Sequence, residues 1–217
     1  MEKITDIYIM MKISTLILGH MRTNCYIIID SDSNEAAVVD PADSGMQIYI
    51  KLKQMNLNCK YIILTHAHFD HMLGLGELRK LTGAPLCIHE ADAPALCDPE
   101  KTYMLQFGGK NDVFDAPEIM LHDNDTLKLG ENNIKTTHTP GHTMGSVCLF
   151  WGNNIISGDT LFKDDIGRYD LYGADYAQLM RSLLQLSELE GDYKVYPGHG
   201  SSTTLSHEKS YNIYLRK

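Results

Sequence analysis

The 217-residue sequence contains no Cys-x-x-Cys pair and no apolar run near the ~20 residues that span a bilayer. Its five cysteines are odd in number and widely spaced, so we expect reduced, buried thiols and no disulfide framework. Residues 1–11 lack a basic segment that leads into a long apolar stretch, so they do not resemble a signal peptide. These absences predict a cytoplasmic protein that does not bind membranes.

Positive charge is also scarce. The chain has 19 Lys and Arg against 28 Asp and Glu, which gives a net charge of -9. Nucleic-acid binders need basic patches to neutralise phosphates, so we expect no nucleic-acid partner. The hydrophobic share of 43% is ordinary for a globular protein, and the length suits one large core. We therefore predict a single domain over residues 1–217.

The chain lacks linker-like or low-complexity stretches and divides into two similar halves of short apolar runs with helical segments. The expected strands are 12–18, 25–29, 36–39, 61–64 and 86–88, then 126–129, 134–137, 147–151, 154–157 and 193–196. The expected helices are 44–55, with Ser44 as N-cap, 73–81, 176–188 and 207–215. Residues 94–117 have no clear period, so we expect a long loop with helical turns, a candidate lid.

Each half is predicted to be a β-meander with helices on its outer side. A sheet with one apolar face must bury that face against another layer. Two such halves packed sheet to sheet give an α+β fold, a four-layer αββα sandwich.

The strongest chemical signal is Thr65-His66-Ala67-His68-Phe69-Asp70-His71, directly after an expected strand. It places four candidate metal ligands, His66, His68, Asp70 and His71, within six residues. Neutral imidazole and carboxylate are ligands that Zn²⁺ prefers. The alternative is a surface turn rich in histidine, which this density disfavours because the chain has only ten histidines.

Three later positions complete a candidate site. His142, Asp159 and His199 each stand just after an expected strand, beside glycine or proline that sharpens the turn. Each alone is a weak signal, since a lone Gly-Asp is most often a turn. Strand ends at one edge of a sheet converge in space, so these loops are expected to meet the first cluster.

Together these residues resemble the ligand set of the metallo-β-lactamase superfamily, and the resemblance extends over almost the whole chain. The segment 158–162, followed by Ile166-Gly167-Arg168, is most similar to hydroxyacylglutathione hydrolases (glyoxalase II) and their short bacterial relatives. The resemblance implies the metallo-β-lactamase sandwich and two divalent metal ions, zinc first, with Fe or Mn as alternatives. It assigns His66, His68 and His142 to one ion, Asp70, His71 and His199 to the other, and Asp159 to both.

The same resemblance implies a mechanism and a substrate. A hydroxide that bridges two cations would attack the carbonyl of a small-molecule thioester, with Asp70 as the catalytic residue that orients it. Arg168 stands where the family places a basic residue on glutathione, and Tyr169 is expected to line the same pocket. The chain stops about 18 residues after His199, without the C-terminal helical region of glyoxalase II proper.

Some residues have two interpretations. Asp40 is expected either to hydrogen-bond a ligand histidine from behind or to form a plain Asp-Pro turn. His89 and His122 are expected at the surface without a ligand role.

Met1 and Met11 stay open as alternative starts, and both a monomer and a homodimer are compatible with the sequence.

Other functions remain as alternatives. A persulfide dioxygenase would hold a single iron on two histidines and one aspartate, and its relatives tend to lack the Gly-His-Gly ending that His199 provides here. Lactone or phosphodiester hydrolysis could use the same fold. A non-enzymatic metal-binding scaffold protein predicts the loss of at least one ligand, and none is missing.

Overall fold

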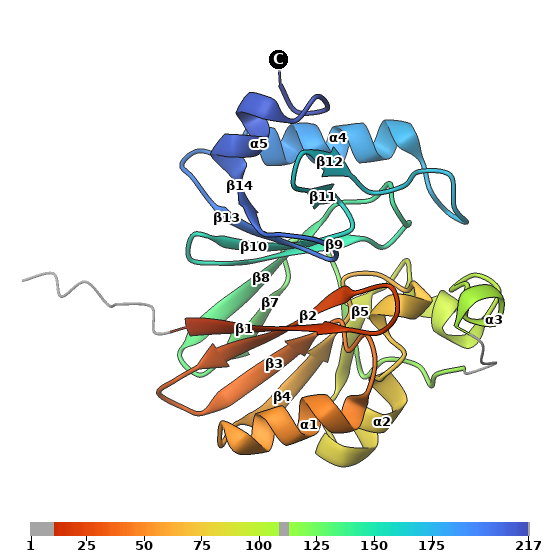
Figure 1. The fold of residues 1–217 in the computed structure, drawn as a ribbon, viewed down its shortest axis with the longest axis vertical. Coiled ribbons are helices and arrows are strands. Elements are labelled where there is room, and N and C mark those ends of the chain that lie inside the picture. Colours follow the sequence, from red (N-terminus) through yellow and green to blue (C-terminus); the bar gives the residue numbers. More distant parts are fainter. Residues whose placement is uncertain (1–10, 109–112, 217) are drawn as a thin grey trace, which may run out of the picture.

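The computed structural model describes residues 11–108 and 113–216. Two six-stranded sheets lie face to face, and helices cover the outer side of each (Figure 1). The predicted α+β fold with four layers is confirmed. The expectations for residues 1–10 lie outside the described residues. In the described part of the chain, no helix is both long and apolar enough to cross a membrane.

The first sheet is only partly a meander. Its order is β1 (Met11–Leu18), β2 (Thr23–Asp30), β3 (Glu35–Val39), β4 (Asn58–Ile63), β5 (Leu86–His89) and β6 (Ile119–Leu121). The first three strands pair antiparallel, but β3–β4, β4–β5 and β5–β6 are parallel, so the predicted meander is wrong there. The helices α1 (Gly45–Gln54) and α2 (Leu75–Thr82) follow β3 and β4. A helical crossover returns the chain to the same end of the sheet, which makes the next strand parallel.

The second sheet has the order β14 (Thr203–Thr204), β13 (Lys194–Pro197), β10 (Asn154–Gly158), β9 (Val147–Trp151), β8 (Asn132–His138) and β7 (Thr126–Leu129). Only β10–β13 is parallel, and α4 (Tyr176–Ser187) lies between these strands in the chain. A small hairpin, β11 (Leu161–Phe162) and β12 (Asp165–Ile166), and the helix α5 (Leu205–Tyr211) complete this half. The strands β6, β11, β12 and β14 were not expected, because two or three residues carry no measurable period.

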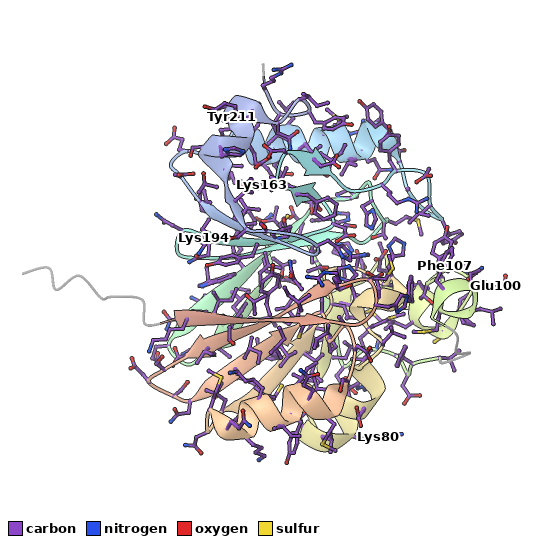
Figure 2. All side chains as sticks on the ribbon, viewed as in Figure 1. Lys80, Glu100, Phe107, Lys163, Lys194 and Tyr211 are labelled. Carbon is purple, nitrogen blue, oxygen red and sulfur yellow. The ribbon has the colours of Figure 1, made fainter. Side chains whose placement is uncertain are left out.

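Strand β2 is buried at all eight positions because both of its faces are covered. Cys25 and Ile27 pack in the core under α1 and α2, whereas Tyr26 and Ile28 pack in the core between the two sheets. Figure 2 shows side chains filling the space between the layers. A third core lies under α4 and contains its residues Leu179, Leu183 and Leu186.

The expected loop with helical turns is present between β5 and β6. It contains the 3-10 helix η2 (Ala93–Cys97) and the short helix α3 (Met104–Phe107), which stands at the side of the molecule in Figure 1. The backbone N–H of Phe69, in the 3-10 helix η1 (Phe69–His71), donates to the carbonyl of Thr102 at 2.8 Å. This bond ties the loop to the histidine cluster.

Candidate metal centre

The four loops with candidate ligands follow strands of both sheets. The cluster 66–71 follows β4, and the other ligand-type residues follow β8, β10 and β13. The structure brings all seven side chains together, in groups whose ligand atoms lie within 4.8 Å of one another. These groups are His66, His68 and His142; Asp70, His71 and His199; and His66, His71 and Asp159.

Asp159 lies between the first two groups. Its Oδ2 is 3.6 Å from His142 Nε2 and 3.6 Å from His199 Nε2, while its Oδ1 is 3.4 Å from His71 Nε2. One carboxylate thus faces both groups, as a ligand shared by two ions must.

The spacing within each group suits metal coordination. Nδ1 of His68 lies 3.0 Å from Nε2 of His142. Two nitrogens of a tetrahedral zinc site lie about 3.3 Å apart, because each Zn–N bond is about 2.0–2.1 Å. In the second group, Oδ2 of Asp70 is 3.1 Å from His199 Nε2 and accepts a hydrogen bond of 2.9 Å from the Thr23 hydroxyl.

Hydrogen bonds behind the histidines fix which ring nitrogen is protonated. Nδ1 of His71 lies 2.9 Å from a carboxylate oxygen of Asp40, which can only accept, so Nδ1 carries the proton. The Thr65 hydroxyl donates to Asp40 at 2.8 Å and must therefore accept from Nδ1 of His66 at 3.0 Å. Nδ1 of His142 donates to the carbonyl of Arg168 at 2.8 Å. In all three histidines the Nε2 lone pair is left for a metal.

Several buried polar atoms of this cluster lack protein partners. Among the described residues, five buried side-chain nitrogen or oxygen atoms have no hydrogen-bond partner, and four belong to this cluster. They are His66 Nε2, His68 Nε2, His71 Nε2 and Asp159 Oδ1. An unpaired buried polar group costs about 1–3 kcal/mol, so several in one place indicate a missing shared partner. Cations bound by His66 Nε2, His71 Nε2 and Asp159 Oδ1 fit that requirement, whereas His68 faces its group through Nδ1.

The protonation of the cluster suits cation binding. Burial and neighbouring histidines keep the pKa of His66 far below its usual value and lower the pKa of His68 to about 3, so both rings are neutral at pH 7. Burial alone would raise the pKa of Asp70, but the neighbouring histidines outweigh it and hold that pKa below the usual range. At His71 burial is outweighed by the surrounding carboxylates, Asp70 first, which raise its pKa. The carboxylates thus favour a positive charge at His71, and a bound cation can supply that charge in place of the proton.

Gly198 is required by the close packing of the site. A Cβ atom there would lie 2.1 Å from Asp159 Oδ1 and 2.7 Å from His71 Cε1. Only a residue without a side chain lets the last ligand loop approach this closely.

The structure also reveals one residue that the sequence did not indicate. Asp92 is buried, and its carboxylate accepts hydrogen bonds from the backbone N–H of Ala67 at 3.0 Å, the Thr143 hydroxyl at 2.8 Å and the backbone N–H of Gly145 at 2.7 Å. Ala67 separates two ligand histidines and Thr143 follows a third. Asp92 therefore connects the ligand loops of the two sheets, and no local sequence signal marks it.

Arg168 and Tyr169 are not brought among the candidate ligands. The exposed guanidinium of Arg168 pairs with Asp170 through bonds of 2.9 and 3.0 Å. Tyr169 is 46% exposed and its ring lies 4.8 Å from that of Tyr176. Both side chains lie on the outer surface near the site, and only the Arg168 backbone contacts a candidate ligand.

The prediction of a surface position for His89 is wrong. Its side chain is buried and stacks on His138, with ring centroids 3.9 Å apart and planes at 12°. It ends β5, and its Nδ1 accepts a hydrogen bond of 3.2 Å from the backbone N–H of Ala91. His122 is exposed, as expected.

The chain is similar to known proteins over most of its length. Residues 18–199 match the family model described as metallo-beta-lactamase superfamily. Metallo-hydrolase YqgX of Bacillus subtilis is 31% identical over 94% of this chain and 97% of its own length. Hydroxyacylglutathione hydrolase GloC of Haemophilus influenzae is 30% identical over 94% of this chain and 98% of its own length.

Two solved structures are similar over nearly the whole chain. The BLEG-1 B3 metallo-beta-lactamase has a TM-score of 0.88 with 31% identity, and covers 95% of this chain and 100% of its own. TTHA1623 in a di-iron-bound form has a TM-score of 0.83 with 30% identity, and covers 93% and 100%. A similar chain thus binds iron, so zinc is not fixed as the metal.

Proposed function

The chain belongs to the metallo-beta-lactamase superfamily as a metal-dependent hydrolase, and from this membership we propose that it hydrolyses thioesters at a two-metal centre. The observation that carries the proposal is the pair of ligand groups with Asp159 between them and the buried, unpaired ligand atoms of His66, His71 and Asp159 among them. The Haemophilus relative named for hydroxyacylglutathione hydrolysis supports a small-molecule thioester as substrate.

In this proposal His66, His68 and His142 hold one ion and Asp70, His71 and His199 hold the other, with Asp159 shared. Zinc suits the nitrogen-rich first group, and iron or manganese are compatible with the same donors. When bound, two such cations make water acidic enough to supply a nucleophile near pH 7 and polarise the substrate carbonyl.

The chain's own residues position the reactants. The Asp70 carboxylate, held by the Thr23 hydroxyl, orients the attacking water toward the carbonyl carbon. A carbon–oxygen bond forms and the carbon–sulfur bond breaks, and its electron pair leaves with sulfur. One proton of the water ends on the thiol and the other in solvent, which gives a carboxylate and a free thiol.

A substrate panel tests this function. We expect metal-loaded protein to cleave glutathione thioesters, and not to cleave lactones or phosphodiesters or to consume oxygen with a persulfide. Asp70→Asn should lose at least about 100-fold in kcat/KM, because a charged group next to the reacting atoms is lost. The matched control is Asp32→Asn, in the exposed turn after β2, which should keep full activity.

The outcomes separate the alternatives. Sulfite production from a persulfide by protein with one iron per chain would replace the proposal with the dioxygenase function. Full metal loading with no turnover of any substrate would favour a metal-binding scaffold.

A further inference from the structure

A cavity of about 90 Å³ lies directly beside the candidate metal centre. One wall contains the side chains of His68 and Thr143, so it adjoins two ligand loops. The cavity is lined by Ala67, His68, Ala91, Asp92, Pro94, Ala95, Lys101, Thr143, Met144 and Tyr172.

The cavity lining is small and mostly apolar, with three alanines, a proline and Met144. The neutral His68 ring keeps an unpartnered Nε2, but the buried Asp92 carboxylate is paired, since it accepts from the Thr143 hydroxyl and from two backbone N–H groups. Lys101, at 38% side-chain exposure, pairs with Asp98 at 3.1 Å. A ligand here therefore meets apolar surface, a paired carboxylate and no unpaired cation.

The walls of the cavity are held in place from two sides. The segment that carries Lys101 is bonded to the ligand loop through Phe69 N–H and the Thr102 carbonyl. It is bonded to the segment of Tyr172 through that residue's N–H and the Tyr103 hydroxyl, at 2.7 Å. Walls held in this way limit the size of any group that enters.

We propose that this cavity receives the acyl group of the substrate and restricts the protein to thioesters of short, uncharged acyl chains. The inference rests on the proposed thioester hydrolysis. A packed water-sized group occupies about 30 Å³, so a cavity of about 90 Å³ holds roughly three, enough for a short acyl chain but not for a glutathionyl group. A carboxylate on the acyl group would lose its hydration beside the Asp92 carboxylate and would find no unpaired cation to compensate. The cavity therefore disfavours negatively charged acyl groups.

The test is a series of glutathione thioesters with acetyl, propionyl, butyryl, hexanoyl and octanoyl groups, together with the succinyl thioester. We expect kcat/KM to be high from acetyl to butyryl, and to fall at least about 10-fold for octanoyl and for succinyl. Ala95→Leu fills the cavity and should lower kcat/KM for butyryl about 10-fold while acetyl is unaffected. Met144→Ala enlarges the cavity and should extend good turnover toward octanoyl.

The control is Ala177→Leu, an exposed position on α4 that does not line the cavity, which should leave the profile unchanged. Metal content and Tm of each variant show whether it is folded. A profile that does not depend on acyl length in the wild type, or that both cavity variants leave unchanged, overturns the inference and leaves thioester hydrolysis standing. No cleavage of any thioester by the metal-loaded wild type overturns the proposed function and this inference with it.

Discussion

At the scale of single residues, the candidate ligands could be identified from the sequence and Asp92 could not. The ligands are predictable because His66, His68, Asp70 and His71 are close together in the sequence and of one chemical type. Asp92 is not, because two of its three partners are backbone N–H groups, one of them 53 residues away, and backbone groups leave no trace in sequence. The sequence offers Asp40 as a possible hydrogen-bond partner of a ligand histidine, and its 2.9 Å bond to His71 agrees with that hypothesis.

We predict that Asp92→Asn weakens metal binding. An amide keeps one acceptor oxygen but presents N–H₂ toward a donor, so at least one bond to a ligand loop is lost. Loss of such outer partners typically costs about 10–100-fold in metal affinity. Chelator competition measures this affinity without any activity assay.

Asp30→Asn is the matched control for this variant. Asp30 is also buried and accepts from the Ser33 N–H and the Asn132 side chain, but it contacts no ligand loop. It should lower Tm and leave the metal affinity unchanged. Equal metal affinity in the two variants would show that Asp92 only stabilises the fold.

A second residue-scale prediction concerns Gly198→Ala. The added Cβ would collide with Asp159 and His71, so the second ion should be lost or bound at least about 10-fold more weakly. Gly76→Ala, where the nearest atom is 3.5 Å away, should be neutral or stabilise α2 by about 0.5–1 kcal/mol. Metal counts per chain for both variants distinguish a specific collision from a general effect of the methyl group.

At the scale of elements, long periodic segments were predictable and their pairing was not. The expected helices at 44–55, 73–81 and 176–188 correspond to α1, α2 and α4. Ser44 precedes α1 but makes no side-chain cap, and Glu77 of α2 accepts from the N–H of Met46 instead, at 2.9 Å. A tertiary partner replaced the local one, which sequence patterns cannot show.

Helix α4 provides the element-scale prediction. Asp175 caps it by accepting from the Gln178 N–H at 2.9 Å, and the Asp175 N–H bonds the carbonyl of Gly141, next to a candidate ligand. Asp175→Ala should lower the free energy of unfolding by about 1 kcal/mol, as loss of an N-cap does. Because the backbone bond remains, metal content should be unchanged. Urea unfolding and metal analysis of the same sample test both parts, and a large loss of metal would contradict the second.

At the scale of the whole molecule, the metal centre joins the two sheets. Candidate ligands come from loops after β4 in one sheet and after β8, β10 and β13 in the other. The layered architecture was predictable from two halves that each need a buried face. The convergence of the loops on one point was expected, because they follow strand ends at one edge. Which atoms of the ligand side chains face one another could be learned only from the structure.

Metal removal should therefore destabilise the whole protein. Ions that bind only the folded state stabilise it by RT ln(1 + [L]/Kd), about 2.7 kcal/mol at 100 times Kd. We expect Tm to rise steadily with the logarithm of free zinc concentration above Kd. Calorimetry over a range of buffered zinc concentrations measures this dependence. A Tm that does not change with zinc concentration would mean that the histidine cluster binds no zinc in the folded state.

The most direct test of the central claim is the number of ions bound per chain, counted after equilibrium dialysis against zinc or ferrous iron. The wild type should bind about two ions, and His199→Ala, which removes a donor from the second group alone, should bind about one. A wild type that binds one ion or none, or a His199→Ala protein that still binds two with unchanged affinity, would contradict a two-metal centre built from these seven side chains.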